Sequence, residues 1–391
     1  MAKYKLGEIC EIVSGSTPKT SVEEYWDGDI KWITPAELND DSYIVYDSAR
    51  KITEEAVKKT GLSSFPEGTV ILSSRAPIGK VAIAGCEMYC NQGFKNLICS
   101  EKINNKYLYW FLKGNTDLLN SLGRGATFKE ISKQIVSNIE INVPEENEQK
   151  KAVENLERIS KLIKLRKQEL DKLDELIKAR FVELFGDPKL NPKKWDVVNI
   201  SEVVGGKVSN GFFAKRDDYC DDGNIRVLGV ANIVNRMYSN LEDLPRTNAD
   251  DKDIEKFEVK YGDMLFCRSS LVAEGIGKAS IIPEDVQENI LFECHVIRLP
   301  LDLSKCVPEF VQTLSTMDYF RNQVISQSKT ATMTTIGQAG ILKTDIILPP
   351  IDKQKEFYDF VKQVDKSKVA VQKALDEAQL LFDSLMQEYF G

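Results

Sequence analysis

The sequence predicts an α+β protein with two tandem mixed α/β domains, each followed by a long helix, and with the two helices paired as an antiparallel coiled coil. Three observations support this fold class. The second half of the chain repeats the first, apolar residues recur at heptad spacing near the end of each copy, and short β-rich runs alternate with turn residues elsewhere. Such a tandem duplication implies a pseudo-two-fold internal repeat.

The repeat is clearest toward the end of each copy. Pro144 and Pro349 lie 205 residues apart, and so do Gln149 and Gln354. The spacing holds to the last pair of residues in each copy, and it drifts further upstream, as loops of unequal length would cause. The repeat divides the chain into a first domain (1–143), a first long helix (144–186), a second domain (187–348) and a second long helix (349–391).

The two domains are expected to be mixed α/β because their composition changes every few residues. Strand-like runs are bounded by Gly, Pro, Asn and Asp, and a short amphipathic helical pattern follows them in each copy. The predicted strands include 69–72, 80–84, 225–230 and 294–299, and the predicted short helices are 106–122 and 308–325.

The long helices are predicted from apolar residues spaced alternately three and four apart. The series are Leu156, Ile159, Ile163, Leu170, Leu173, Ile177 and Leu184 in the first copy, and Val361, Val364, Val371, Leu375, Ala378, Phe382, Leu385 and Tyr389 in the second. A helix over 144–186 would be about 60 Å long. It can bury such a stripe only by pairing, so we expect the two helices to hold the domains a fixed distance apart.

Composition narrows the class of protein. The chain has 391 residues, a net charge of −8 and no apolar run long enough to span a membrane. Its N-terminus lacks a signal-peptide core, so we expect a cytoplasmic protein with reduced cysteines. The single histidine, His295, excludes Ser-His-Asp chemistry in both copies and any multi-histidine metal site. Its apolar neighbours predict a buried position on a strand.

Catalytic motifs are missing. Gly79-Lys80 and Gly277-Lys278 lack the spacing and the following Ser or Thr of a phosphate-binding P-loop. Asn191-Pro192 is followed by Lys193-Lys194 and not by the Pro and aromatic residue of an adenine methyltransferase. We therefore expect no catalytic residue and no metal or cofactor site on this chain. Two domains joined by a helical spacer, without catalytic motifs, indicate a protein that recognises a binding partner and does not catalyse a reaction.

Loops in both copies carry the side chains that contact base edges and phosphates, namely Arg, Lys, Asn, Gln, Ser and Thr. The predicted DNA-binding residues are Ser16, Thr17, Lys19, Lys31, Trp32, Thr34, Arg75, Lys80, Asn91, Gln92, Lys95, Arg124, Thr127, Asn210, Lys215, Arg216, Arg268, Ser269, Lys278, Lys329 and Thr332. Trp32 suits a core position as well as a contact. Where the copies diverge, each would read a different sequence, which implies a split, asymmetric target.

Charge is distributed unevenly between the copies. Residues 1–143 carry a net charge of −1, whereas residues 187–391 carry −7. Because affinity for DNA depends on neutralising phosphates, the second copy would need a more basic partner to supply positive charge.

Several motifs together resemble a known family. They are GDIKWIT at 28–34, GKVAIA at 79–84, CNQGFK at 90–95, GATF at 125–128 and FGDP at 185–188. Their order, with a weaker second set, resembles the specificity (S) subunit of type I restriction–modification systems over essentially the whole chain. The second copy has Val227-Leu228-Gly229 where the first has Trp32-Ile33-Thr34, so contacts expected in the first copy do not transfer to the second.

The resemblance implies a fold and a mechanism. Each domain would be a target-recognition domain similar to that of TaqI-like adenine methyltransferases, reading one half of a bipartite site in double-stranded DNA. The helices would set the spacer between the halves. Two methyltransferase subunits, which hold S-adenosylmethionine and modify adenine N6, would dock on the chain. Restriction/translocase subunits, which use ATP and Mg²⁺, would join them.

Two other functions stay open at this point. A coiled-coil adaptor that binds only proteins would show no salt-dependent affinity for DNA. A hydrolase or nuclease would turn over substrate in isolation and would gather carboxylates in one pocket.

Overall fold

The computed structural model describes residues 2–75, 77–125, 129–330 and 332–391. They form two compact units. Unit 1 comprises Met1–Lys167 and Lys373–Gly391, and unit 2 comprises Gln168–Gln372. Each unit therefore contains one globular part and a portion of both long helices.

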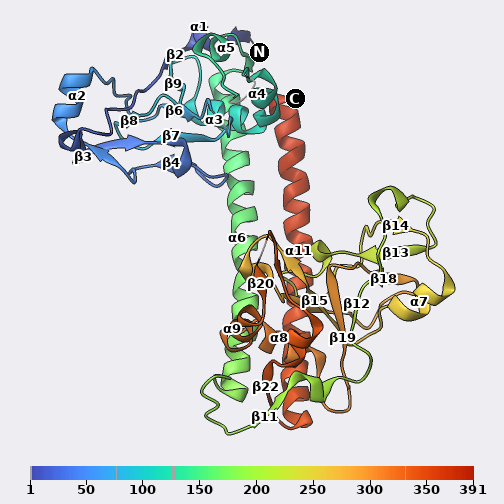
Figure 1. Cartoon of the computed structure of the whole chain (residues 1–391). Coiled ribbons are helices and arrows are strands. Elements are labelled where there is room, and N and C mark those ends of the chain that lie inside the picture. The colour runs from blue at the N-terminus through green and yellow to red at the C-terminus, as the bar shows by residue number, and fades with distance from the viewer. Residues whose placement is uncertain (1, 76, 126–128, 331) are drawn as a thin grey trace. The chain divides into compact units, whose positions relative to one another are not determined.

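The long helices are α6 (Glu146–Phe185) and α11 (Ile351–Phe390), each 40 residues long and drawn in green and red in Figure 1. In unit 1 the Asn155 side-chain amide donates to the Tyr389 hydroxyl at 2.9 Å. In unit 2 Lys368 Nζ lies 2.6 Å from Asp174 Oδ1. The start of α6 thus meets the end of α11, and the later part of α6 meets the earlier part of α11. The predicted antiparallel pairing is confirmed.

In the part of the chain that the structure describes, the globular part of unit 1 contains three sheets and several short helices. Strand β1 pairs with β10, a five-stranded sheet has the order β2-β9-β6-β7-β4, and a three-stranded sheet has the order β5-β3-β8. Its elements are β1 (Ala2–Lys5), α1 (Leu6–Ile9), β2 (Cys10–Val13), η1 (Glu23–Tyr25), β3 (Trp26–Ile33), η2 (Pro35–Glu37), β4 (Ile44–Val45), β5 (Lys51–Ile52), α2 (Glu54–Thr60), β6 (Val70–Leu72), β7 (Val81–Ala84), β8 (Tyr89–Cys90), β9 (Asn96–Cys99), α3 (Asn105–Gly114), α4 (Thr116–Leu122), α5 (Lys133–Ser137) and β10 (Glu140–Val143).

Unit 2 repeats this plan. Strand β11 pairs with β22, and the other sheets have the orders β12-β19-β15-β17, β14-β13-β18 and β16-β21-β20. Its elements are β11 (Asp196–Asn199), η3 (Ile200–Val203), β12 (Ser209–Asn210), η4 (Arg216–Asp218), β13 (Ile225–Leu228), η5 (Val230–Asn232), β14 (Arg246–Thr247), α7 (Asp251–Phe257), β15 (Asp263–Cys267), β16 (Ser269–Ser270), η6 (Ala273–Gly275), β17 (Ala279–Ile281), β18 (Ile290–Phe292), β19 (Val296–Pro300), α8 (Pro308–Ser315), α9 (Asp318–Ser326), β20 (Lys329–Thr330), β21 (Thr334–Thr335), α10 (Gln338–Leu342) and β22 (Asp345–Leu348).

Each globular part packs directly on the helix pair. In unit 1, Tyr107 on α3 lies 5.0 Å from Phe390 on α11, centroid to centroid. In unit 2, four buried rings from α6, α8 and α11 form one cluster, made of Phe181, Phe185, Phe310 and Phe357. The heptad series had placed Leu184 and not these two α6 rings on the buried stripe. The register differs because the last turns of α6 enter the domain core.

A buried glutamine joins each long helix to the domain it follows. The Gln149 carboxamide oxygen accepts from the Asn104 backbone N–H at 2.8 Å, just before α3. The Gln354 oxygen accepts from the Val307 N–H at 2.9 Å, just before α8. The repeated glutamine therefore fills the same role in both units, accepting from a backbone amide at a helix N-terminus that has no partner within the helix. None of the described helices is long and apolar enough to cross a membrane.

Replacing Gln354 with Met should open unit 2 locally, because the Val307 N–H would lose its acceptor. We expect the free energy of opening to fall by about 1–3 kcal/mol. Amide hydrogen exchange at Val307 would report this as a loss of protection. The neighbouring exposed change, Lys355→Met, is the control, and protection at Val307 equal to wild type in Gln354→Met would contradict the assigned role.

Candidate nucleic-acid interface

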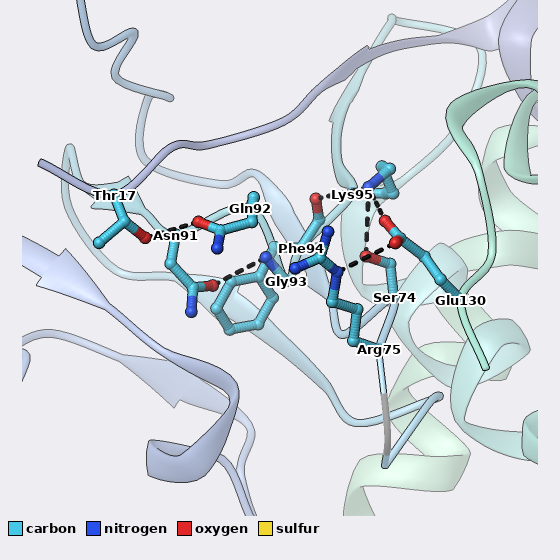
Figure 2. Close-up of polar contacts among 9 residues, drawn as sticks. All are labelled: Thr17, Ser74, Arg75, Asn91, Gln92, Gly93, Phe94, Lys95 and Glu130. Atoms are coloured by element: carbon cyan, nitrogen blue, oxygen red, sulfur yellow. Dashed lines mark hydrogen bonds and ion pairs between the residues drawn. The ribbon is translucent and has the colours of Figure 1, made fainter. Parts of the chain in front are cut away.

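In unit 1, several candidate side chains gather where strands of the two larger sheets end (Figure 2). Arg75 follows β6, Lys95 precedes β9, and Glu130 lies on the segment that leads to α5. Arg75 Nε is 3.0 Å from Glu130 Oε2, and Lys95 Nζ is 3.3 Å from Glu130 Oε1. We call these three residues the Glu130 ion cluster.

The members of the Glu130 ion cluster differ in exposure. The Arg75 side chain is 46% exposed, whereas that of Lys95 is 9% exposed and also donates to Ser74 Oγ at 3.2 Å. Burial alone would raise the pKa of Glu130, but hydrogen bonds from Arg75 and Lys95 outweigh it and hold that pKa below its usual value. Arg75 can therefore reach a ligand, while the buried Lys95 holds the Glu130 carboxylate from the interior of the domain.

A second group ties the 15–19 loop to the segment before β9. Thr17 Oγ1 donates to Gln92 Oε1 at 2.5 Å, and the Gly93 N–H donates to Asn91 Oδ1 at 2.9 Å (Figure 2). Gly15 permits this approach, since a Cβ there would lie 1.9 Å from the Cys90 carbonyl oxygen. The hydroxyl and amide groups are thus presented together by two segments far apart in sequence.

The remaining candidates of unit 1 fall into two classes. Lys31, Thr34 and Lys80 are tied to the scaffold: Lys31 Nζ lies 3.2 Å from Cys86 Sγ, Thr34 pairs with Glu37, and Lys80 Nζ donates to the Leu38 carbonyl. The exposed class comprises Ser16, Thr17, Lys19, Arg75, Gln92 and Arg124. Thr127 lies outside the described residues.

Trp32 belongs to the core. It is 2% exposed, its indole N–H donates to the Ser16 carbonyl at 3.1 Å, and its ring packs edge-on against Trp26 at 5.1 Å. Of the two positions that the sequence allowed for this tryptophan, the structure shows the buried one. Its indole positions the loop that carries Ser16 and Thr17.

Unit 2 places its candidates in the corresponding loops. Lys215 and Arg216 lie at the start of η4, and Lys329 and Thr332 follow α9. These four residues are exposed. The partly buried candidates are Asn210, Arg268, Ser269 and Lys278. The Arg268 guanidinium donates to the Cys294 carbonyl at 3.1 Å, and Lys278 Nζ donates to Asn235 Oδ1 at 2.7 Å.

The two units share a backbone frame here but not its side chains. In unit 1, Arg75 bridges to Glu130 and the Ile131 N–H donates to the Ser74 carbonyl. In unit 2, Ser269 pairs with Thr335 and the Ile336 N–H donates to the Arg268 carbonyl. A salt-bridged pair in one unit is therefore replaced by two hydroxyl side chains in the other, on the same antiparallel bridge.

Sequence reasoning missed Glu130 and Thr335, which complete these bridges. Both directly precede the isoleucines that the repeat aligns, so the internal alignment carried the signal. The expectation of a buried strand position for His295 is wrong: His295 is exposed, in the turn before β19. Its backbone carbonyl accepts from the Arg268 N–H, as that of Gly93 does from Ser74.

The arrangement suits contact with a polar surface. Among the described residues, no three His, Cys, Asp or Glu side chains are grouped to hold a metal ion. The exposed groups are hydroxyls, amides and cations, which can donate to base edges and phosphate oxygens.

Changing Glu130 to Gln should weaken the local structure in a pH-dependent manner. Because the folded-state pKa is lowered, its contribution to stability is complete above the unfolded pKa and is lost as pH falls through the folded pKa. With solvent screening at this partly exposed site, we expect at most about 1 kcal/mol at pH 7. Amide exchange at Ile131 would show the difference from wild type at pH 7, and the difference should vanish at acidic pH.

Glu140→Gln is the matched control for this change. Glu140 also pairs with a lysine, Lys3, at 2.6 Å, but both side chains are more than half exposed. Its removal should leave exchange at Ile131 unchanged. Equal exchange at Ile131 in wild type and Glu130→Gln across the pH range would contradict the structural role given to the carboxylate.

Comparison of the sequence with known proteins identifies the family of this chain. The profile described as "Type I restriction modification DNA specificity domain" matches residues 1–175 and 192–378. The specificity subunit of the type I restriction enzyme MjaIX of Methanocaldococcus jannaschii is 29% identical over 405 residues, covering 98% of this chain and 90% of that protein. The EcoR124I/EcoR124II specificity subunit of Escherichia coli is 31% identical over 164 residues, 40% of each chain.

Solved structures support the fold. An S subunit from M. genitalium superposes with a TM-score of 0.54 at 14% identity, covering all of this chain and 96% of that one. A chain of a type I restriction–modification system, solved in work on complex assembly and conformational transition, gives 0.55 at 16% identity, covering all of this chain and 97% of that one. With the sequence profile matching both halves, the chain belongs to the type I restriction–modification DNA specificity subunits, a family that is non-catalytic and holds no cofactor of its own.

Proposed function

We propose that this subunit recognises a bipartite, asymmetric site in double-stranded DNA, with the domain of each unit reading one half. The observation that carries the proposal is the shared backbone frame with unlike side chains. Arg75 and Glu130 occupy the bridge in unit 1, and Ser269 and Thr335 occupy it in unit 2. A salt-bridged guanidinium and a pair of hydroxyls offer different donors and acceptors, so the two domains would favour different bases.

The proposed contact surface consists of the exposed candidate residues of each unit. The candidates that are hydrogen-bonded to the rest of the domain would support this surface. In unit 1, Arg75, Gln92 and Arg124 would contact bases or phosphates, with Lys95 and Glu130 holding Arg75 in position. In unit 2, Arg216 and Lys329 would do so. Contacts to phosphates would set the register on the duplex, and contacts to base edges would give the sequence preference.

The long helices would set the spacer between the half-sites. Helices α6 and α11 have the same length of 40 residues, and their ends are buried in the domain cores. A paired helix is stiff over this length, unlike a Gly-rich linker. A fixed helical spacer supports a fixed number of base pairs between the half-sites.

Catalysis would belong to partners. Two methyltransferase subunits with bound S-adenosylmethionine would dock on the chain and modify adenine N6, the target base being flipped out of the duplex. Restriction/translocase subunits using ATP and Mg²⁺ would join the same cytoplasmic complex. Basic surfaces of these partners would offset the net charge of −8 on this chain.

Mapping N6-methyladenine tests the proposal directly. We expect a methylation-free host to gain a split motif when it expresses this chain with its methyltransferase subunit, and not with the methyltransferase alone. Arg75→Ala should lower methylation at that motif, whereas Lys3→Ala, which removes an exposed ion-paired cation away from the loops, should not. An assembled complex that adds no methylation would favour a protein-only adaptor.

Lengthening both helices tests the spacer. Seven residues inserted into α6 and seven at the facing level of α11 would preserve the heptad pattern and add about 10 Å. We expect both half-sites to stay the same while the spacer grows by about three base pairs, given a rise of about 3.4 Å per pair. An unchanged spacer in a complex that still methylates would exclude the helices as the ruler.

A further inference from the structure

Unit 2 contains a cavity of about 330 Å³ between α6, α8 and the loop that precedes β17. One wall is α6, with Ile177 and Lys178, and the opposite wall is α8, with Gln312 and Thr313. The Gln312 side-chain amide donates to the carbonyls of Arg236 and Ala279 at 3.2 and 3.1 Å, which fixes that wall to the neighbouring loop and strand.

The lining of the cavity is strongly basic. It includes the four cations Lys178, Arg236, Lys278 and Arg321. The acid among the lining residues, Asp174, lies 2.6 Å from Lys368, so its charge is already balanced. Four positive charges around one hollow favour an anion of more than one negative charge.

Two buried polar atoms in this lining have no hydrogen-bond partner among the described residues. They are the Thr313 hydroxyl, in a side chain that is 2% exposed, and Nη1 of Arg321. The other terminal nitrogen of Arg321 donates to the Glu274 carbonyl at 2.9 Å, which holds the guanidinium in place. Buried polar groups are normally paired, so two residues that line this cavity each carry a hydrogen-bonding atom that the described residues leave unsatisfied.

Unit 1 shows why the space exists. The amides of Asn104 and Val307 make the same bond to the repeated glutamine, which aligns Trp110 on α3 with Thr313 on α8. Trp110 packs against Phe382 at 5.7 Å, and Phe382 aligns with Ile177 in the repeat. Two large rings that fill unit 1 are therefore replaced in unit 2 by a threonine and an isoleucine.

We propose that this cavity is an oxyanion site that binds a phosphate group. Two arginines and two lysines around one cavity, with a threonine in its wall, provide the kinds of donor that phosphate oxygens require. Lys278, held by Asn235 in a left-handed backbone conformation at the rim, completes the ring of cations. The site does not depend on the DNA recognition proposed above, because it is defined by a cavity within one unit.

The test is titration calorimetry of the full chain with inorganic phosphate and with pyrophosphate. We expect saturable binding, with affinity at least tenfold weaker in Arg321→Gln. Thr313→Trp, which copies unit 1, should abolish binding. Arg236→Gln should weaken it if the tryptophan variant does not fold. Lys343→Gln, an exposed charge change in the same unit, should bind as wild type does.

Either of two results would overturn the site: no saturable binding of either anion, or equal binding by wild type, Arg236→Gln and Arg321→Gln. A competition experiment with duplex DNA identifies the source of the phosphate. If a duplex carrying the mapped motif competes with pyrophosphate, the bound group is a backbone phosphate. If both bind together, the ligand is a free phosphorylated molecule. Methylation mapping reports separately on the proposed function, so the two failures are distinguishable.

Discussion

The burial of the helix pair inside each domain core is the constraint on which the structure depends. An amphipathic helix of 40 residues cannot remain isolated in water with its apolar stripe exposed. Here the stripe is buried twice, against the other helix and against the domain. Phe181 and Phe185 pack on Phe310 and Phe357 in unit 2, and Tyr107 packs on Phe390 in unit 1. Within each unit, the packing of the domain and the pairing of the helices thus depend on the same side chains.

Because the two units are duplicates, comparing them distinguishes the backbone hydrogen bonds that recur from the side chains that vary. The backbone bonds that support the candidate surface recur, as between Ile131 and Ser74 and between Ile336 and Arg268. Side chains that point away from those bonds are free to differ at small cost in stability. The same freedom accounts for both the unlike bridges and the cavity of unit 2, whose lining residue Thr313 aligns with Trp110 of unit 1.

The sequence was sufficient to predict the repeat, the long helices and their pairing, because periodicity over many residues reports directly on a buried stripe. It was insufficient for single positions. Trp32 is buried, although a lysine directly precedes it; His295 is exposed, although it lies between Cys294 and Val296. Lys95 is buried because Glu130 is nearby, and that proximity depends on two segments far apart in the chain. Phe181 and Phe185 were missed because the end of α6 follows the packing of a domain and not the heptad. The individual DNA contacts stay predictions, since composition identifies suitable donors but not the face they share.

The core of unit 1 includes residues from the end of α11, more than 200 residues after the first domain. Phe382, Leu385, Tyr389 and Phe390 pack against residues within the first 160. During synthesis on the ribosome, the first domain cannot close its core until the final turns of α11 have emerged, while unit 2 lies wholly between. N-terminal domains usually fold first. Here the first domain depends on the last turns of α11, so a chain that lacked those turns would leave that domain exposed to proteases.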